Sequence, residues 1–173
     1  MKKTGKKKPK MTVYLAGAIE ATDDEGRTWR EHYQKELAKI GIEAWIPNDL
    51  NLEHELTMEQ WIVLKSKDDL SEFKSEFRKR IIGPDIAAVD AADIIVVRWD
   101  GERTTGTAHE VGRAYMQGQM VYLVTPRPFR EVPAWMLACV EAEFHDLEQL
   151  TKYLSKRYKL KAGSRRRRRR NSG

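Results

Sequence analysis

The sequence predicts a single α/β domain built on a doubly wound parallel sheet. Short apolar runs of strand length alternate with longer segments of helical periodicity, as at 94–97, 106–117 and 121–124. Polar loops follow the apolar runs, where the strands of such a sheet lead into helices. The length of 173 residues also suits one domain with a substantial core.

The first two strands are predicted on either side of a helix. The run TVYLAGAI at 12–19 ends in small residues, which let the backbone approach a ligand. Residues 22–24 offer N-cap side chains to a helix at 29–40, whose apolar positions recur at helical spacing. Gly41 ends that helix as a C-cap, and a second strand follows at 43–46.

The middle of the chain is less regular. Within 48–80 we expect one or two short helices that cover the functional site. Gly83-Pro84-Asp85 then predicts the start of a new short helix, because proline suits the first helical position. That helix leads into the third strand at 94–97, the polar loop 99–105 and the helix 106–117, which Gly118 closes.

The last third supplies the remaining strands. Residues 121–124 form the fourth strand, and a proline-rich loop leads to a short helix at 133–140. A small edge strand at 142–145 precedes a last helix at 147–158, where Asp146 and Gln149 resemble a capping box. Five strands alternating with helices indicate a flavodoxin-like or Rossmann-like sheet.

Charge is distributed unevenly along the chain. Residues 1–10 contain six lysines, and residues 161–173 contain one lysine and six arginines, with no acidic residue in either segment. The domain at 11–160 contains the other 19 basic residues and all 26 acidic residues, so its net charge is about −7. We therefore expect an acidic domain with two disordered basic tails. Such tails either contact nucleic acid or another polyanion, or only aid solubility.

The sequence argues against a zinc site, a membrane span and a signal peptide. Cys139 is the single cysteine and lies in an apolar run, so we expect it to pack in the core. The four histidines are scattered, which argues against a zinc site. No apolar run approaches the roughly 20 residues of a membrane span, and none follows the first lysines as in a signal peptide. We expect a cytosolic protein.

Glu110 is the first candidate catalytic residue. It follows the polar loop by one helical turn, and the helix start GTAHE suits anionic or hydroxyl-rich ligands. Neither a Walker loop nor a dinucleotide-binding fingerprint is present. A partly buried carboxylate here can attack the anomeric carbon of a sugar. The alternative is an ordinary helical glutamate that pairs with Arg113.

Asp85 and Trp99 are further candidates. Asp85 is predicted in a first helical turn at the same edge of the sheet, where a second carboxylate can handle a proton. Stabilisation by the helix dipole is the alternative explanation for Asp85. Four tryptophans either pack in the core or stack on a nucleobase: Trp29, Trp45, Trp61 and Trp99. Trp99 is the best stacking candidate, because it lies at a strand end.

Three segments resemble the nucleoside 2-deoxyribosyltransferase family and the related 2′-deoxynucleoside 5′-monophosphate N-glycosidases. They are YLAGAI at 14–19, PDIAAVDAAD at 84–93 and TTGTAHEVGRA at 104–114. The resemblance covers most of residues 12–125 in order. It implies cleavage of an N-glycosidic bond, with transfer of the sugar to another nucleobase or to water. It also implies that no metal or organic cofactor is needed.

The resemblance assigns roles to individual residues. Glu110 matches the nucleophile that attacks C1′ and holds a covalent glycosyl intermediate. Asp85 matches the acid/base residue that protonates the leaving base, and Tyr14 matches the tyrosine that positions Glu110. Gly17 matches the glycine of the sugar and base pocket. The other residues predicted to contact substrate are Ile19, Trp99, Thr104, Gly106 and His109. The family also implies a homo-oligomer in which a neighbour completes the site, and Trp135 and Met136 are candidates for that interface.

Two residues give opposite indications about the substrate. At the position of Thr104, nucleoside transferases often carry an acidic residue, whereas monophosphate hydrolases carry a hydroxyl residue. Thr104 therefore favours a nucleotide substrate. Glu20 lies where those hydrolases tend to have a basic residue, and an acid there repels a phosphate. Arg103 or Arg113 would have to compensate. A non-catalytic nucleotide-binding or sensing domain, and a nucleic-acid-tethered protein, remain the alternatives to an enzyme.

Overall fold

The computed structural model describes residues 11–19, 23–47, 56–102 and 104–160, so the predicted basic tails lie outside the described residues. Five strands form one parallel sheet in the order β2-β1-β3-β4-β5. The doubly wound α/β fold is therefore confirmed. The strand order reverses between β1 and β3, and the carboxyl ends of these two strands are where such folds bind ligands. The strands are β1 (Thr12–Gly17), β2 (Glu43–Trp45), β3 (Ile94–Arg98), β4 (Met120–Val124) and β5 (Ala142–Phe144).

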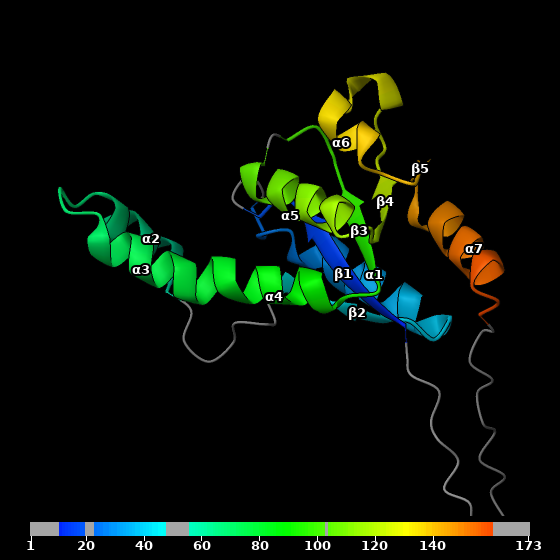
Figure 1. Ribbon diagram of the computed structural model, residues 1–173, viewed down its shortest axis with the longest axis horizontal. Coiled ribbons are helices and arrows are strands. Elements are labelled where there is room, and N and C mark those ends of the chain that lie inside the picture. The colour runs from blue at the N-terminus through cyan, green and yellow to red at the C-terminus, as the bar shows by residue number, and fades with distance from the viewer. Residues whose placement is uncertain (1–10, 20–22, 48–55, 103, 161–173) are drawn as a thin grey trace, which may run out of the picture.

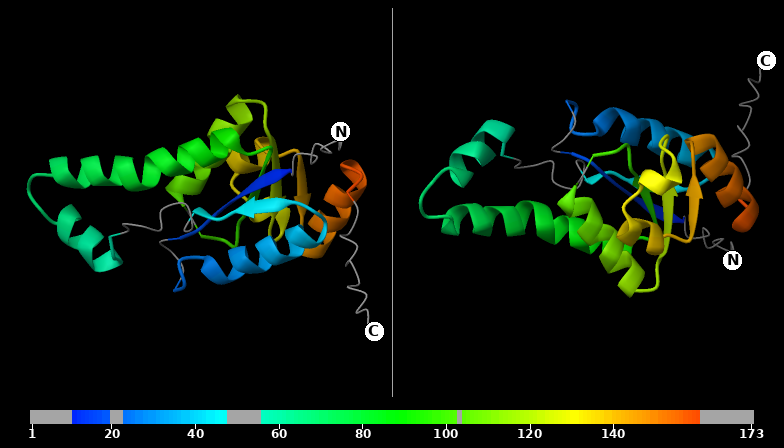
Figure 2. Two further views of the ribbon diagram at one scale, coloured as in Figure 1. Left: turned by 90° about the horizontal axis from the view of Figure 1, so that it is seen from below. Right: turned by 90° about the horizontal axis from the view of Figure 1, so that it is seen from above.

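Helices cover both faces of the sheet (Figures 1 and 2). Alternate residues of β1 point to opposite faces: Val13 and Leu15 belong to one core cluster, Tyr14 and Ala16 to the other. Helices α1 and α7 pack on the first cluster, and α4, α5 and α6 pack on the second. These helices are α1 (Arg27–Lys39), α4 (Gly83–Ala91), α5 (Thr105–Met116), α6 (Ala134–Ala138) and α7 (Leu147–Arg157).

The predicted helix boundaries are largely confirmed. Gly41 and Gly118 follow α1 and α5 with φ values of 85° and 72°, a conformation that favours glycine. Asp146 caps α7 by accepting a hydrogen bond from the Gln149 amide at 2.8 Å. At the start of α1 the N-cap is Gly26, and Asp24 accepts a hydrogen bond from the Thr28 amide at 2.9 Å.

Helix α4 begins at Gly83 as predicted, with Pro84 in its first turn, but other helical turns precede it directly. Helix α3 (Ser71–Phe77), the π-helical turn η2 (Arg78–Ile82) and α4 follow one another without a break. Across the π turn the Gly83 amide donates to the Arg78 carbonyl. Pro84 has no amide hydrogen and its ring crowds the preceding turn, and a wider π turn accommodates both effects. Asp85 consequently lies inside a continuous helix.

The short helices expected within 48–80 exist, but they do not cover the sheet. Helix α2 (Met58–Lys65) and α3 extend beyond the sheet as a hairpin (Figure 1). Trp61 packs edge-on against Phe73 and Phe77, with ring centroids 6.0 and 5.3 Å away. Trp61 is therefore part of a local aromatic cluster that holds the hairpin together. Residues 48–55 of the predicted segment lie outside the described residues.

Candidate active site

A short hydrogen bond in the candidate site joins β1 to α5. Tyr14 projects from β1 onto the face covered by α5, and its side chain is fully buried. Its hydroxyl donates a hydrogen bond of 2.6 Å to Oε1 of Glu110. The Glu110 side chain is half-buried. The sheet and the helix therefore hold one oxygen of this carboxylate in a fixed position.

Burial and neighbouring charges act in opposite directions on this pair. Burial raises the pKa of the Glu110 carboxyl, while the Tyr14 hydrogen bond and the positive charge of Arg30 lower it. The pKa of Tyr14 is raised first by burial and then by the negative charges of Glu110 and Asp85. Tyr14 therefore stays protonated and serves as a hydrogen-bond donor.

Asp85 on α4 belongs to the same electrostatic cluster. Its charge raises the pKa values of both Tyr14 and Arg30, and its Oδ1 atom is buried. Because Asp85 lies within a continuous helix, the free amides of a helix N-terminus are not available to stabilise its charge. The helix-dipole explanation for Asp85 therefore loses its basis. The structure brings together the three residues predicted to be catalytic.

Arg30 is a member of this cluster that the sequence reasoning missed. It lies on α1, is fully buried, and its guanidinium donates hydrogen bonds to backbone carbonyls at the carboxyl end of β1. Desolvation lowers the pKa of Arg30 to about 10, against the opposing effect of Glu110, Tyr14 and Asp85. In the sequence it is one charged residue of a polar helix, and no local pattern distinguishes it.

Gly17 marks the place where β1 passes closest to its neighbours. A Cβ atom at Gly17 would lie 2.7 Å from the Trp29 ring and 3.1 Å from the Arg98 carbonyl. Only glycine fits there without displacing Trp29. That tryptophan is buried against Tyr33, with 5.1 Å between ring centroids, which confirms a core role for it.

The remaining predicted substrate contacts are distributed around the start of α5. Thr104 is the N-cap residue and is half-buried, whereas Gly106 and His109 are exposed. Space is open next to Gly106, where an added Cβ would meet nothing within 4 Å. Ile19 is half-buried just beyond the end of β1. Glu20 and Arg103 lie outside the described residues.

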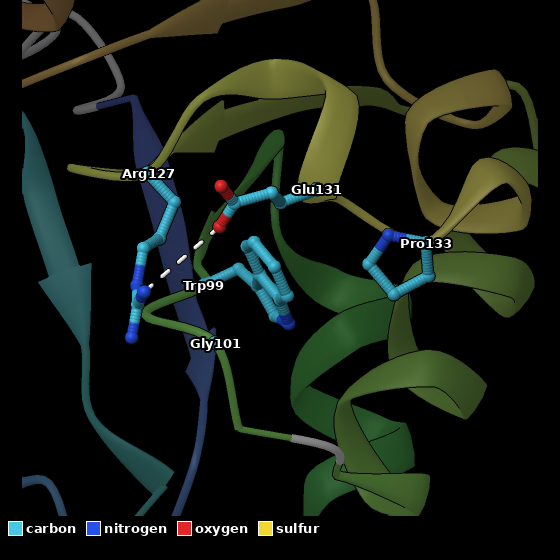
Figure 3. A pocket seen from close by; sticks show the side chains of 5 residues that line it. All are labelled: Trp99, Gly101, Arg127, Glu131 and Pro133. Carbon is cyan, nitrogen blue, oxygen red and sulfur yellow. Dashed lines mark ion pairs between the residues drawn. The ribbon is translucent and has the colours of Figure 1, made fainter.

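Trp99 belongs to the same buried cluster as Tyr14. It is buried, with 8% of its surface exposed, and it lines a pocket of about 530 Å³ at the ends of β3 and β4 (Figure 3). Two residues that line this pocket form an ion pair, with 3.9 Å between Nη1 of Arg127 and Oε2 of Glu131. Tyr14, Asp85 and Glu110 are not among its lining residues, which are Trp99, Gly101, Arg127, Glu131 and Pro133.

The alternative pairing of Glu110 with Arg113 is wrong. Arg113 instead binds both oxygens of Asp90 on α4, at 2.5 and 2.6 Å. Cys139 is buried as expected, and burial raises the pKa of its thiol. Among the described residues, no group of three or more histidine, cysteine, aspartate or glutamate side chains is arranged to hold a metal ion. None of the described helices is long and apolar enough to cross a membrane.

Comparison with known proteins identifies the family. The family model of nucleoside 2-deoxyribosyltransferases matches residues 13–148. The chain belongs to the nucleoside 2-deoxyribosyltransferase family. This match spans all five strands and confirms the resemblance seen in the three sequence segments. The family consists of enzymes that act on nucleosides and nucleobases, so the assignment to an enzyme is confirmed as well.

Solved structures share the fold at low sequence identity. A 2-deoxyribosyltransferase from Bacillus psychrosaccharolyticus is 20% identical, with a TM-score of 0.61 over 82% of this chain and 91% of its own. A conserved protein from Enterococcus faecalis V583 is 16% identical, with a TM-score of 0.60 over 86% and 99%. A 2-desoxiribosyltransferase from Leishmania mexicana is 17% identical, with a TM-score of 0.54 over 84% and 97%. No curated protein matches the chain.

Proposed function

We propose that the protein cleaves the N-glycosidic bond of a 2′-deoxynucleoside or its 5′-monophosphate through a covalent intermediate on Glu110. The observation that carries the proposal is the 2.6 Å hydrogen bond from the buried Tyr14 hydroxyl to Oε1 of Glu110. It fixes a carboxylate next to the switch point of the sheet, with a second carboxylate, Asp85, in the same cluster. Two carboxylates at one site suit nucleophilic attack with separate proton transfer.

The chemistry divides into two steps. In the first, Oε2 of Glu110 attacks C1′ of the sugar while Tyr14 stays bonded to Oε1. The bond from C1′ to the base nitrogen breaks, and Asp85 donates a proton to the departing base. In the second, a nitrogen of another base or a water oxygen attacks C1′. The bond to Glu110 breaks, and Asp85 accepts the proton that the attacking group releases.

The charge state of Glu110 supports the role of nucleophile. Only the carboxylate form can attack C1′, and burial works against that form. The Tyr14 hydrogen bond and the Arg30 charge favour it. Tyr14 therefore acts as a donor that keeps the nucleophile both oriented and ionised.

The substrate and the acceptor need a direct test. Thr104 favours a nucleotide and Glu20 opposes one, while Arg113 is bonded to Asp90 and lends no support to phosphate binding. Purified protein is incubated with deoxynucleosides and with their 5′-monophosphates, with and without a second free base. A new nucleoside formed only with the second base identifies a transferase. Free base released without an acceptor identifies an N-glycosidase. No turnover, with ligand-induced thermal stabilisation, would contradict the proposal and favour a binding domain.

We further propose that the protein is a homo-oligomer that uses the surface around Trp135. This side chain is 75% exposed on α6, next to the proline-rich loop. Met136, the other predicted interface residue, instead packs in the core and is 6% exposed, so it is withdrawn as a candidate. Light scattering is expected to give a mass above that of one chain, and Trp135→Ala is expected to reduce it. A monomeric mass for the unmodified protein would remove this proposal.

A second candidate role is tethering to a polyanion such as nucleic acid. Residue 11 precedes β1, and Arg157 near the end of α7 pairs with Glu141 just before β5 at 3.4 Å. The described residues therefore begin at the amino end of β1, and the last turn of α7 lies beside the segment that leads into β5. Salt-dependent DNA binding by the full chain, lost in a version with residues 11–160 alone, supports this role. Equal binding by both versions would contradict it.

A further inference from the structure

Arg30 is a fully buried cation whose guanidinium donates hydrogen bonds to the main chain. Its guanidinium donates hydrogen bonds of 2.8 to 3.4 Å to five backbone carbonyls. These carbonyls belong to Leu15, Gly17, Ala18, Glu25 and Gly26. Leu15 and Gly17 belong to β1, Ala18 directly follows it, and the other two residues immediately precede α1. One side chain thus ties the end of the strand to the start of the next helix.

The short length of β2 explains why these carbonyls need a side chain. β2 pairs with β1 only as far as Tyr14, opposite Trp45, whereas β3 continues along β1 to Gly17. The carbonyls of Leu15 and Gly17 extend past the end of β2, and buried carbonyls require donors. Arg30 supplies these donors at 3.1 and 2.8 Å. Its planar fork suits several acceptors at once, which a lysine ammonium does not.

Gly26 leaves room for this arrangement. Its φ is 67°, and an added Cβ would lie 2.3 Å from Nη1 of Arg30 and 2.4 Å from the Ala18 carbonyl. The main chain therefore closes directly around the guanidinium. Helix α1 lies on one face of the sheet and α5 on the other, so the charge of Arg30 acts on Glu110 across the end of β1.

We propose that Arg30 is a positioning residue for the nucleophile. It fixes the carboxyl end of β1 that follows Tyr14, and it supplies the buried positive charge opposite the Tyr14–Glu110 pair. The proposal rests on the proposed function for the attacking role of Glu110. Arg30 does not touch the reacting atoms and acts only through the strand and through its charge.

The charges around Glu110 set the expected direction of the effect. Tyr14 on β1 and Arg30 on α1 lower the pKa of Glu110 against burial. Asp85 on α4 acts on Tyr14 and Arg30, and Arg113 on α5 is bonded to Asp90. Removing the Arg30 charge therefore raises the pKa of Glu110. Since Glu110 must be ionised to attack, the acid limb of kcat/KM then moves to higher pH.

Two substitutions separate position from charge. Arg30→Met removes both the charge and the hydrogen bonds, and Arg30→Lys keeps the charge but not the fork. Arg113→Met is the matched control, because it removes a charge from the Glu110 helix. The Glu110 carboxyl is titrated by ¹³C NMR in protein with labelled glutamate, with Glu110→Gln used to assign its signal. Values of kcat and KM are measured for the same variants.

The expected results differ among the three variants. Arg30→Met raises the Glu110 pKa and moves the acid limb upward, and Arg113→Met leaves both at their original positions. Arg30→Lys keeps the Glu110 pKa and lowers kcat by about 100-fold at a nearly unchanged KM. An unchanged Glu110 titration in folded Arg30→Met would overturn the proposal. An unchanged kcat in Arg30→Lys would also overturn the proposal. If Arg30→Met does not fold, the kcat of Arg30→Lys is the deciding measurement.

The titration separates this proposal from the proposed function. A protein with no turnover of any nucleoside or nucleotide contradicts the proposed function. Its Glu110 signal still reports whether Arg30 controls the ionisation of this carboxylate. A normal turnover combined with an insensitive Glu110 signal leaves the proposed function intact and removes the role of Arg30.

Discussion

Two carboxylates accept hydrogen bonds from residues of β1, and they have opposite surroundings. At the amino end of β1, Asp93 is exposed and its Oδ2 accepts hydrogen bonds from the amide and the hydroxyl of Thr12, at 2.7 and 2.9 Å. The Asp93 amide in turn donates to the Thr12 hydroxyl at 3.1 Å. Two residues further along β1, the Tyr14 hydroxyl holds Glu110 of α5 at 2.6 Å, and burial raises the pKa of Glu110.

This difference distinguishes a structural acid from a chemical one. Asp93 uses its exposed carboxylate to join the segments that begin β1 and β3. Glu110 has a charge that burial opposes and that Tyr14 and Arg30 must support. Perturbed carboxylates of this second kind gather at active sites. The following predictions test whether Asp93 serves stability and Glu110 serves catalysis in this way.

The largest expected effect is on turnover. Glu110→Ala should lower the rate of base release by roughly 10⁴-fold or more, because the attacking group is lost. Asp93→Ala should leave the rate per folded molecule unchanged. Product formation is measured by chromatography, with circular dichroism to confirm that both variants fold. Comparable losses in the two variants would contradict the distinction between the two carboxylates.

A smaller loss of turnover is expected when the donor to Glu110 is removed. Hydrogen bonds to charged groups contribute about 1.5–3 kcal/mol, so Tyr14→Phe should lower kcat/KM by roughly 10–100-fold. The acid limb of its pH profile should also move upward, since the Tyr14 hydrogen bond lowers the pKa of Glu110. Tyr122→Phe is the control, because the Tyr122 hydroxyl contacts Tyr158 at 3.0 Å. Equal kinetics for the two phenylalanine variants would argue against a role for Tyr14.

Asp93→Ala should affect stability instead. The substitution removes two hydrogen bonds between the segments that begin β1 and β3, and we expect a loss of about 1 kcal/mol in the free energy of unfolding. Urea unfolding followed by fluorescence measures this change. An unchanged unfolding midpoint would show that water replaces Asp93 at no cost.

The smallest expected effect is a dependence of stability on pH. The folded pKa of Glu110 lies above its ordinary value of 4.5, so the folded state retains this proton to higher pH than the unfolded chain. The contribution of Glu110 to stability is therefore complete below pH 4.5 and declines as pH rises through the folded pKa. Glu110→Gln lacks this decline. Urea unfolding at several pH values should show that the free energy of unfolding of Glu110→Gln increases relative to that of the unmodified protein as pH rises. Parallel plots of this free energy against pH would contradict the sign of the pKa shift.

The sheet could be predicted from the sequence because its strands are short apolar runs bounded by small or polar residues. The start of α4 at Gly83 was predicted, but the helical segment that runs into it without a break was not. Proline usually begins a helix, and the π turn that lets the helix continue through it depends on backbone geometry rather than on a local residue pattern. The same limit applies to the hairpin of α2 and α3, whose aromatic contacts join residues far apart in sequence.

The candidate site was partly predictable. Spacing alone placed Glu110 and Asp85 at the same edge of the sheet, and the family resemblance added Tyr14. The contact between Tyr14 and Glu110 spans 96 positions of the chain, which no local pattern encodes. Arg30 was missed because helical periodicity counts an arginine as a surface residue. Its burial follows from the early end of β2, a property of strand pairing.

The most direct test of the central claim is the capture of the covalent intermediate. A deoxynucleoside carrying fluorine at C2′ reacts through a destabilised oxocarbenium-like transition state, so the glycosyl-enzyme is slow to form and slow to break down. The protein is incubated with this compound, digested and examined by peptide mass spectrometry. The account predicts a fluorodeoxyribosyl adduct on Glu110 that is absent from Glu110→Gln. An adduct on another residue, or base release from this compound with no adduct at any time, would contradict it.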